Sequence, residues 1–341
     1  MRPRSLKAGL AAAAIAVAVL VAVPVAFAAF SSSTENSGDI VVAANDFRAP
    51  QVTAGVLGKS VGGATGFVKQ GGEYFVYANV AADTGNPASG IASVRADVSS
   101  VTTGATAVTL TAGSFSAGGV SYGYRSAALG ANAVLTAGAK SFTVTATDNA
   151  GNANAFAGSV TIDNTAPLAG DVQTTNVAGG TNGLAELGDT LVLSFSEPVE
   201  PESILAGWSG AGTNVTVRIV DNSLLGLGLG DDVVQIFNAG NTAALPLGSV
   251  DLGRSDYVSG LVGGVVKFGA GGTRSTMTMS GNTITVVLGT YEGEGLLGSN
   301  RMTAGGTGTA VWTPVATPYD RAANAMSTAT ATESGPADKE F

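Results

Sequence analysis

Histidine and cysteine are both missing from this sequence, and each absence narrows the chemistry open to it. Without histidine, Ser-His-Asp and Cys-His catalysis are excluded, together with histidine-ligated zinc or haem and the usual proton shuttle near neutral pH. Without cysteine, no disulfide can staple the fold. The catalytic chemistry that remains is that of carboxylates, which hydrolyse glycosides in pairs without other residue types.

Charge is also scarce, since Asp, Glu, Lys and Arg make up only 12% of the residues. The balance is acidic, with 25 Asp and Glu against 16 Lys and Arg, and the net charge at pH 7 is −9. An acidic surface repels phosphate backbones, so we expect no nucleic-acid partner. The 49 glycines and the 45% hydrophobic content are typical of strands and tight turns, not of charged amphipathic helices.

The first 28 residues have the pattern of a signal peptide. Three basic residues within the first seven precede an uncharged apolar run, residues 10–23, which is too short to span a bilayer as a helix. Residues 26–28 read Ala-Phe-Ala, the small-x-small pattern that signal peptidase cleaves. We therefore expect cleavage after Ala28, export, and no membrane contact of the mature chain. The alternative is an uncleaved membrane anchor.

The mature chain is expected to begin with a flexible leader, residues 29–49, which is polar and rich in turn formers. No later stretch is long and apolar enough to span a membrane, and the last residues carry no signal for covalent attachment to the cell wall. We expect a secreted, extracellular protein that is either released or associated with the cell wall through non-covalent contacts.

Residues 50–167 have a β pattern throughout. Within residues 91–98, apolar Val94, Ala96 and Val98 alternate with polar side chains, as in a half-buried strand. Similar segments recur at short spacing with turn residues between them, which is typical of an antiparallel sandwich. The predicted strands are residues 74–80, 91–98, 107–111, 120–125, 140–147 and 157–162.

Two motifs at the end of this region resemble a known family. Residues 145–152 read TATDNAGN, and residues 160–167 read VTIDNTAP. Together they resemble the last two strands of bacterial immunoglobulin-like (Ig-like) domains, in which a TATDxAGN hairpin precedes a final strand that exits through VDNTAP into the next repeat. The resemblance implies one Ig-like domain over residues 50–167.

The second region, residues 168–341, resembles another Ig-like family. Residues 188–199 read GDTLVLSFSEPV and resemble the opening of the SbsA-type Ig-like domains of S-layer proteins. Residues 320–325, DRAANA, resemble the closing turn of that family, but Ala323 stands where the family has glycine. The region is long for one sandwich, and we expect a glycine-rich insertion over residues 221–274.

The predicted fold class is therefore all-β, with tandem Ig-like antiparallel β-sandwiches after a signal peptide. Such an arrangement resembles the secreted surface proteins of actinobacteria and other Gram-positive bacteria.

The candidate binding chemistry is calcium. This ion takes six to eight oxygen ligands, and joints between Ig-like domains often supply them from Asp and Asn turns. The candidate ligands are Asp148, Asn149, Asp163 and Asn164, although in a simple hairpin the first and last pairs fall at opposite ends. The alternative is that each residue only stabilises its own turn.

We expect a structural or adhesive protein without catalytic activity, whose partners are cell-envelope polymers, matrix components or other surface proteins. One alternative is a carbohydrate-binding accessory protein with a sugar platform made by Arg218, Arg254, Tyr257 and Trp208. Another is a glycoside hydrolase that uses a carboxylate pair from the acidic cluster Glu197, Glu200 and Glu202.

Overall fold

The computed structural model describes residues 46–85, 87–222, 230–259, 264–294 and 299–341. These residues form antiparallel sheets almost throughout, which confirms the predicted all-β sandwich class. Among them the only helix is the short α1 (Pro201–Ile204), and none is long and apolar enough to cross a membrane. The predicted signal peptide and most of the predicted leader lie outside the described residues.

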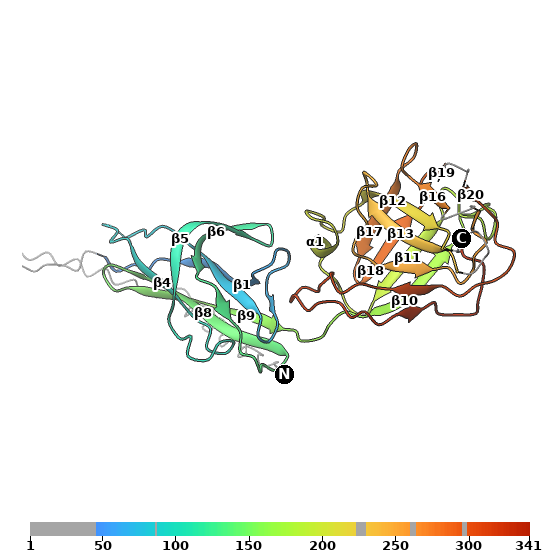
Figure 1. Cartoon of the computed structure of the whole chain (residues 1–341). Helices are drawn as coiled ribbons and strands as arrows, with labels where there is room; N and C mark the ends of the chain where they lie inside the picture. Colours follow the sequence, from blue (N-terminus) through green and yellow to red (C-terminus); the bar gives the residue numbers. More distant parts are fainter. Residues whose placement is uncertain (1–45, 86, 223–229, 260–263, 295–298) are drawn as a thin grey trace, which may run out of the picture. The chain divides into compact units, whose positions relative to one another are not determined.

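The first sheet runs in the order β1-β3-β6-β5-β4-β8-β9-β2, with β7 attached to β3 (Figure 1). All neighbours are antiparallel except β2 and β9, which pair in parallel. The strands are β1 (Val52–Lys59), β2 (Phe67–Val68), β3 (Glu73–Val80), β4 (Ile91–Asp97), β5 (Val108–Ala117), β6 (Val120–Ser126), β7 (Leu129–Gly130), β8 (Gly138–Asp148) and β9 (Ala153–Ile162).

The strands predicted over residues 74–162 are confirmed, because their alternation matches the two faces of the sheet. In β8 the side chains of Phe142, Val144 and Ala146 are buried on one face, while their neighbours are more exposed. Gly55 of β1 lies so close to Phe156 of β9 that a Cβ there would approach the ring to 2.9 Å. The strand segments thus pack face to face around one hydrophobic core.

The second sheet runs in the order β10-β11-β18-β17-β12-β13-β14-β21-β22, and β16 pairs with both β12 and β19. A separate pair joins β15 and β20. The strands are β10 (Ala169–Thr175), β11 (Thr190–Phe195), β12 (Thr213–Val220), β13 (Val233–Asn238), β14 (Ser249–Asp251), β15 (Val258–Ser259), β16 (Val265–Phe268), β17 (Ser275–Ser280), β18 (Thr283–Val287), β19 (Tyr291–Glu294), β20 (Asn300–Arg301), β21 (Val311–Thr313) and β22 (Ala331–Thr332).

The second core centres on large aromatic side chains. Phe195 and Trp312 meet edge to face with ring centroids 5.0 Å apart, and Trp312 Nε1 donates a hydrogen bond to the Leu247 carbonyl (2.7 Å). The described parts of residues 221–274 contribute β13, β14 and β16 to this sheet. The region predicted as an insertion is therefore, where it is described, part of the sheet.

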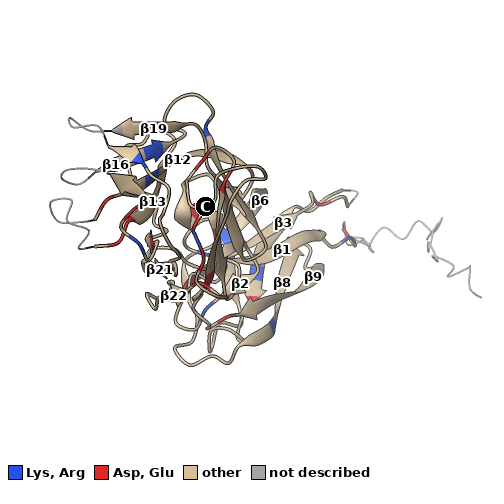
Figure 2. Ribbon diagram, turned by 90° about the vertical axis from the view of Figure 1, so that its right-hand side faces the viewer, with Lys and Arg blue, Asp and Glu red and all other residues tan. Residues whose placement is uncertain are grey.

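The two hydrophobic cores share no residue. One draws on residues 52–162 and the other on residues 172–341, so the predicted boundary after residue 167 falls between them. Figure 2 shows how sparse the charges are along the ribbon, so that a cluster of charged side chains is an unusual feature of this chain.

Candidate functional site

The four residues predicted to bind calcium do not lie together. The β8–β9 ladder runs from the pair Thr147–Ala153 at one end to Gly138–Ile162 at the other. Asp148 is the last residue of β8 and Asn149 follows it at the first end, whereas Asp163 and Asn164 follow β9 at the second. A strand of ten residues spans about 33 Å. One shared calcium site is therefore wrong, and each Asp instead belongs to a different acidic group.

Asp148 lies in a first acidic triad with Asp46 and Asp83, whose carboxylate oxygens lie within 4.8 Å of one another. Asp148 is buried because it continues the inward face of β8. All six oxygens of the triad accept a hydrogen bond. The donors are Arg48 N and Ser89 N to Asp46 (both 2.9 Å), Gly85 N (3.1 Å) and Gly90 N (2.8 Å) to Asp83, and Asn152 N and Nδ2 (both 2.8 Å) to Asp148.

The amide donors also affect the pKa of Asp46. The backbone amides of Arg48 and Ser89 lower the pKa of Asp46 to about 2. The Asn149 side chain donates to the Ser89 carbonyl (2.8 Å), so it fixes the same loop. Within the described residues, this triad is a turn-stabilising network whose carboxylates accept from amide groups.

Asp163 lies in a second acidic triad with Glu197 and Asp320. Asp320 accepts from the backbone amides of Ala322 (2.8 Å) and Asn324 (2.7 Å) and from Asn324 Nδ2 (2.8 Å). Glu197 differs, because its Oε1 is buried and accepts no hydrogen bond from the described residues. Burial, with the Asp163 and Asp320 charges nearby, raises the pKa of Glu197 to about 7.

Asn164 does not face either triad. Its side chain accepts a hydrogen bond from Gln70 N (2.8 Å) and donates one to the Leu135 carbonyl (2.7 Å), so it ties β9 to two loops of the first sheet. Calcium binding by these residues stays a prediction.

The two triads occupy equivalent places in the two halves of the chain. Residues 46–50 read DFRAP and residues 163–167 read DNTAP, and each segment, here called a lead-in, ends two residues before the first strand of its sheet. Each half also has a closing turn, DNAGN over residues 148–152 and DRAAN over residues 320–324. The last Asn of each turn donates to the carbonyl of the first lead-in residue, Asn152 to Asp46 (3.1 Å) and Asn324 to Asp163 (2.9 Å).

Sequence reasoning missed Asp46, Asp83, Glu197 and Asp320 as members of these groups. The signal was present as an internal repeat, because the D-x-x-A-P pattern occurs before both regions. The third member was harder to find, since it is Asp in one half and Glu in the other and lies two or three residues beyond a strand, after β3 and β11.

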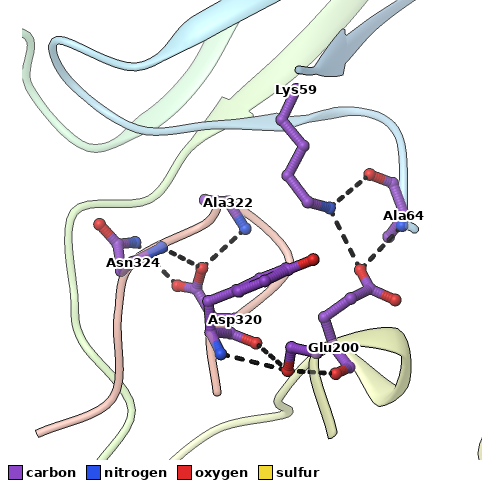
Figure 3. A network of polar contacts seen from close by, with 8 residues as sticks. Lys59, Ala64, Glu200, Asp320, Ala322 and Asn324 are labelled. Carbon is purple, nitrogen blue, oxygen red and sulfur yellow. Dashed lines mark hydrogen bonds and ion pairs between the residues drawn. The ribbon is translucent and has the colours of Figure 1, made fainter. Parts of the chain in front are cut away.

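The second triad borders a contact between residues of the two sheets. We call the contact of residues 59–69 with residues 197–203 and 319–324 the joint. Lys59 Nζ lies 3.2 Å from Glu200 Oε2 and donates to the Ala64 carbonyl (3.0 Å), while Ala64 N donates to the same Glu200 oxygen (2.8 Å) (Figure 3). The side chains of Lys59 and Glu200 are only 3% and 8% exposed.

Burial lowers the pKa of Lys59, and the Glu200 charge opposes that shift. A second lysine, Lys69, donates to the Ala323 carbonyl of the closing turn (2.5 Å). The joint therefore combines a buried ion pair with hydrogen bonds between segments far apart in the sequence.

The sugar platform considered above does not form. Trp208 and Tyr257 are 5% and 1% exposed, so neither ring offers a face to a pyranose. Arg218 stacks on Phe237 at 3.9 Å from the ring centroid, and Arg254 pairs with Asp256. A cleft of about 460 Å³ does lie at the joint, but Trp208 contributes to its wall as a buried side chain whose Nε1 donates to the Ala211 carbonyl (2.6 Å).

The glutamates considered for glycoside hydrolysis contact different groups of residues. Glu200 is held by Lys59 and Ala64, and Glu197 belongs to the second triad. A general acid and its partner must both face the substrate. Glu200 and Glu202 line the cleft at the joint, whereas Glu197 does not, so the three carboxylates do not face one space. In the comparisons with known proteins, no protein-family model matches this chain, and no curated protein matches it either.

Proposed function

We propose that this protein is a secreted, extracellular structural or adhesive component of the cell surface or matrix, made of tandem Ig-like sandwiches and without catalytic activity. Its partners would be cell-envelope polymers, matrix components or other surface proteins. The observation that carries the proposal is the joint, where a buried ion pair links residues of the two sheets.

A buried ion pair is a costly way to gain stability but an effective way to fix geometry. Removing two charges from water offsets most of their attraction, whereas a mispaired arrangement leaves a charge buried alone. Lys59 and Glu200 are therefore satisfied in one arrangement and strongly penalised in others. A protein that spaces or presents a binding surface benefits from such a fixed arrangement, which supports a structural role.

The repeated lead-in and closing turn supply a second line of support. Each closing turn ties down the segment that leads into its own sheet, through Asn152 in the first half and Asn324 in the second. A device that recurs at the start of each half is typical of tandem modules, in which the same connection is made again at each repeat.

Fractionation of the native cells, with a deletion strain beside them, tests the proposal. We expect the mature chain in the medium or bound to the envelope, and we expect its loss to weaken attachment to surfaces or cohesion between cells. A mature chain confined to the cytoplasm, or a purified chain that hydrolyses polysaccharide, contradicts the proposal. Binding to a defined glycan without an effect on attachment would favour the carbohydrate-binding alternative.

A further inference from the structure

The last described segment of the chain, residues 333–341, is tied back onto the second sheet by hydrogen bonds to four distant segments, residues 171–174, 183, 257 and 308–310. Ser334 N and Oγ donate to the Asp171 carboxylate on β10 (2.8 and 2.9 Å). Gly308 N donates to the Asp338 carbonyl (2.7 Å), and Glu340 N donates to the Tyr257 hydroxyl (2.7 Å). These contacts bring Glu333, Asp338 and Glu340 together.

Glu340 is the unusual member of this group. It is fully buried at 0% exposure, although a carboxylate in that position needs strong partners. Its Oε2 accepts a hydrogen bond from Thr174 Oγ1 (2.6 Å), but its Oε1 has no donor among the described residues. The same carboxyl group lies within hydrogen-bonding reach of Glu333, so the free oxygen belongs to the shared acidic group.

The other two carboxylates are likewise without a cationic partner. Glu333 is 8% exposed, and its Oε2 accepts from Ala310 N (2.7 Å), while Asp338 is exposed. Across the residues that the structure describes, no Lys or Arg forms an ion pair with any of the three. Burial and the neighbouring Glu333 charge raise the pKa of Glu340 to about 8, although the Thr174 hydrogen bond opposes the shift.

We infer that Glu333, Asp338 and Glu340 form a calcium-binding site that fastens residues 333–341 to the second sheet. Three carboxylates supply only hard oxygen ligands, which suit calcium, and the chain has no histidine or cysteine to favour a softer metal. One carboxylate oxygen from each of the three residues lies within 4.8 Å of the others, close enough for the three to share one cation. Calcium accepts variable coordination geometry, whereas magnesium demands near-ideal octahedral geometry.

A comparison with the other two acidic triads favours Glu333, Asp338 and Glu340 as the calcium site. In the first triad every carboxylate oxygen already accepts a hydrogen bond. In the second triad Glu197 Oε1 is also buried without a donor, but the residue as a whole is only partly buried. At Glu340 the carboxylate is fully buried, its free oxygen has no donor, and two further carboxylates adjoin it. A cation there would neutralise the group and complete its bonding.

The test uses the whole mature chain, stripped with EDTA and titrated with calcium chloride by isothermal calorimetry, with thermal unfolding in parallel. Asp338→Asn is the principal variant, because an exposed Asp can be changed without disturbing the core. Glu340→Gln is the second variant. The matched control is Asp163→Asn, which removes a carboxylate from the second triad and leaves an oxygen to accept from Thr165 N (3.0 Å).

We expect the wild-type chain to bind calcium more tightly than magnesium and to unfold several degrees higher with it. Asp338→Asn and Glu340→Gln should each weaken binding at this site at least tenfold and lose one binding equivalent, whereas Asp163→Asn should keep it. The assignment is overturned if millimolar calcium gives neither heat nor a thermal shift. It is also overturned if only Asp163→Asn loses binding. A third contradicting result is that Asp338→Asn and Glu340→Gln both bind calcium as the wild type does, and that Glu340→Gln is more stable. A proton shared between Glu333 and Glu340 would then explain how the two buried carboxyl groups lie together.

Discussion

The two closing turns of this protein share the hydrogen bonds between Asp and Asn but have different surroundings. In each turn the Asp carboxylate accepts hydrogen bonds from the backbone and side-chain amides of an Asn four residues later. The backbone amide of the Asp also donates to the carbonyl of that Asn, at 3.0 Å in the first turn and 3.1 Å in the second. The position before the Asn is left-handed in both, with φ +92° at Gly151 and +70° at Ala323. Only the second turn carries a side chain there.

The different surroundings of the two turns indicate which contacts keep Ala323 in its left-handed conformation. Left-handed backbone costs an alanine about 1–2 kcal/mol relative to glycine. The first turn is exposed at residues 149–151, whereas the second lies at the joint with Ala322 buried and the Ala323 carbonyl bound by Lys69. The contacts of the joint therefore maintain a turn that its own sequence favours less.

The two triads beside these turns also differ in their response to protons. Amide donors lower the pKa of Asp46 in the first triad, while burial without donors raises the pKa of Glu197 in the second. The two triads thus contain carboxyl groups whose pKa values are shifted in opposite directions, one at a lead-in and the other after β11. The following changes probe the comparison of the two halves.

The largest effect is expected at the joint, from Lys59→Met. Loss of one partner of a buried ion pair leaves Glu200 charged and unpaired, and it should lower the free energy of unfolding by about 3–5 kcal/mol. Chemical denaturation measures the change. The control is Lys140→Met, whose ammonium binds only the Thr136 hydroxyl at an exposed site, and which should change stability little. A cost below about 1 kcal/mol for Lys59→Met would show that the joint is not held by this pair.

The next largest effect is expected from removing the Asp side chain of each closing turn. Asp320→Ala removes three side-chain hydrogen bonds, and Asp148→Ala removes two, because Ala150 N lacks the bond to Asp148 that Ala322 N makes to Asp320. We expect a loss of about 1–2 kcal/mol for Asp148→Ala, since water can replace the lost acceptor at the exposed turn, and about 2–3 kcal/mol for Asp320→Ala. Equal losses would mean that the joint adds nothing to the second turn.

The pH dependence of stability should differ between the triads when it is measured in EDTA. The pKa of Glu197 is about 7 in the folded chain and lower when unfolded, so its contribution is complete below its unfolded pKa and is lost as the pH rises through 7. Glu197→Gln should therefore reduce the loss of stability between pH 5 and pH 8 by about 1–2 kcal/mol, with allowance for partial exposure.

Asp46 should behave in the opposite way. Its pKa of about 2 lies below the unfolded value, so its contribution is present above about pH 4 and is lost as the pH falls toward 2. Asp46→Asn should make acid unfolding less steep and leave the range from pH 5 to pH 8 unchanged. A Glu197→Gln variant with an unaltered pH profile would contradict the proposed contrast.

The smallest effect is expected from exchanging alanine and glycine at the two left-handed positions. Ala323→Gly should relieve backbone strain and, after the larger unfolded-state entropy of glycine, stabilise the chain by about 0.5–1 kcal/mol. Gly151→Ala should destabilise it by about 1 kcal/mol, although a Cβ there meets no atom within 4 Å. Thermal unfolding of both variants gives the comparison. If Ala323→Gly is destabilising, the methyl group contributes packing that outweighs the strain.

The sequence alone predicted the local elements of the first sheet well. The alternation around Val94, Ala96 and Val98 placed β4, and the TATDNAGN and VTIDNTAP motifs placed β8, its turn and β9. The motif DRAAN likewise marked a closing turn, including the unusual Ala323. These features are local, because a strand's period of two and a turn's side-chain hydrogen bonds are written within a few residues.

The sites were a different matter, and only the tertiary structure decided them. Asp148 and Asp163 stand near each other in the sequence, but the length of β9 separates them, and each meets carboxylates from elsewhere in the chain. The pairing of Lys59 with Glu200, and of Glu333 with Glu340, depends on which loops the sheets bring together. The sequence by itself determined the strands and their turns, because those follow from neighbouring residues. Burial and charge pairing arose only on packing, because they depend on side chains that are distant along the chain.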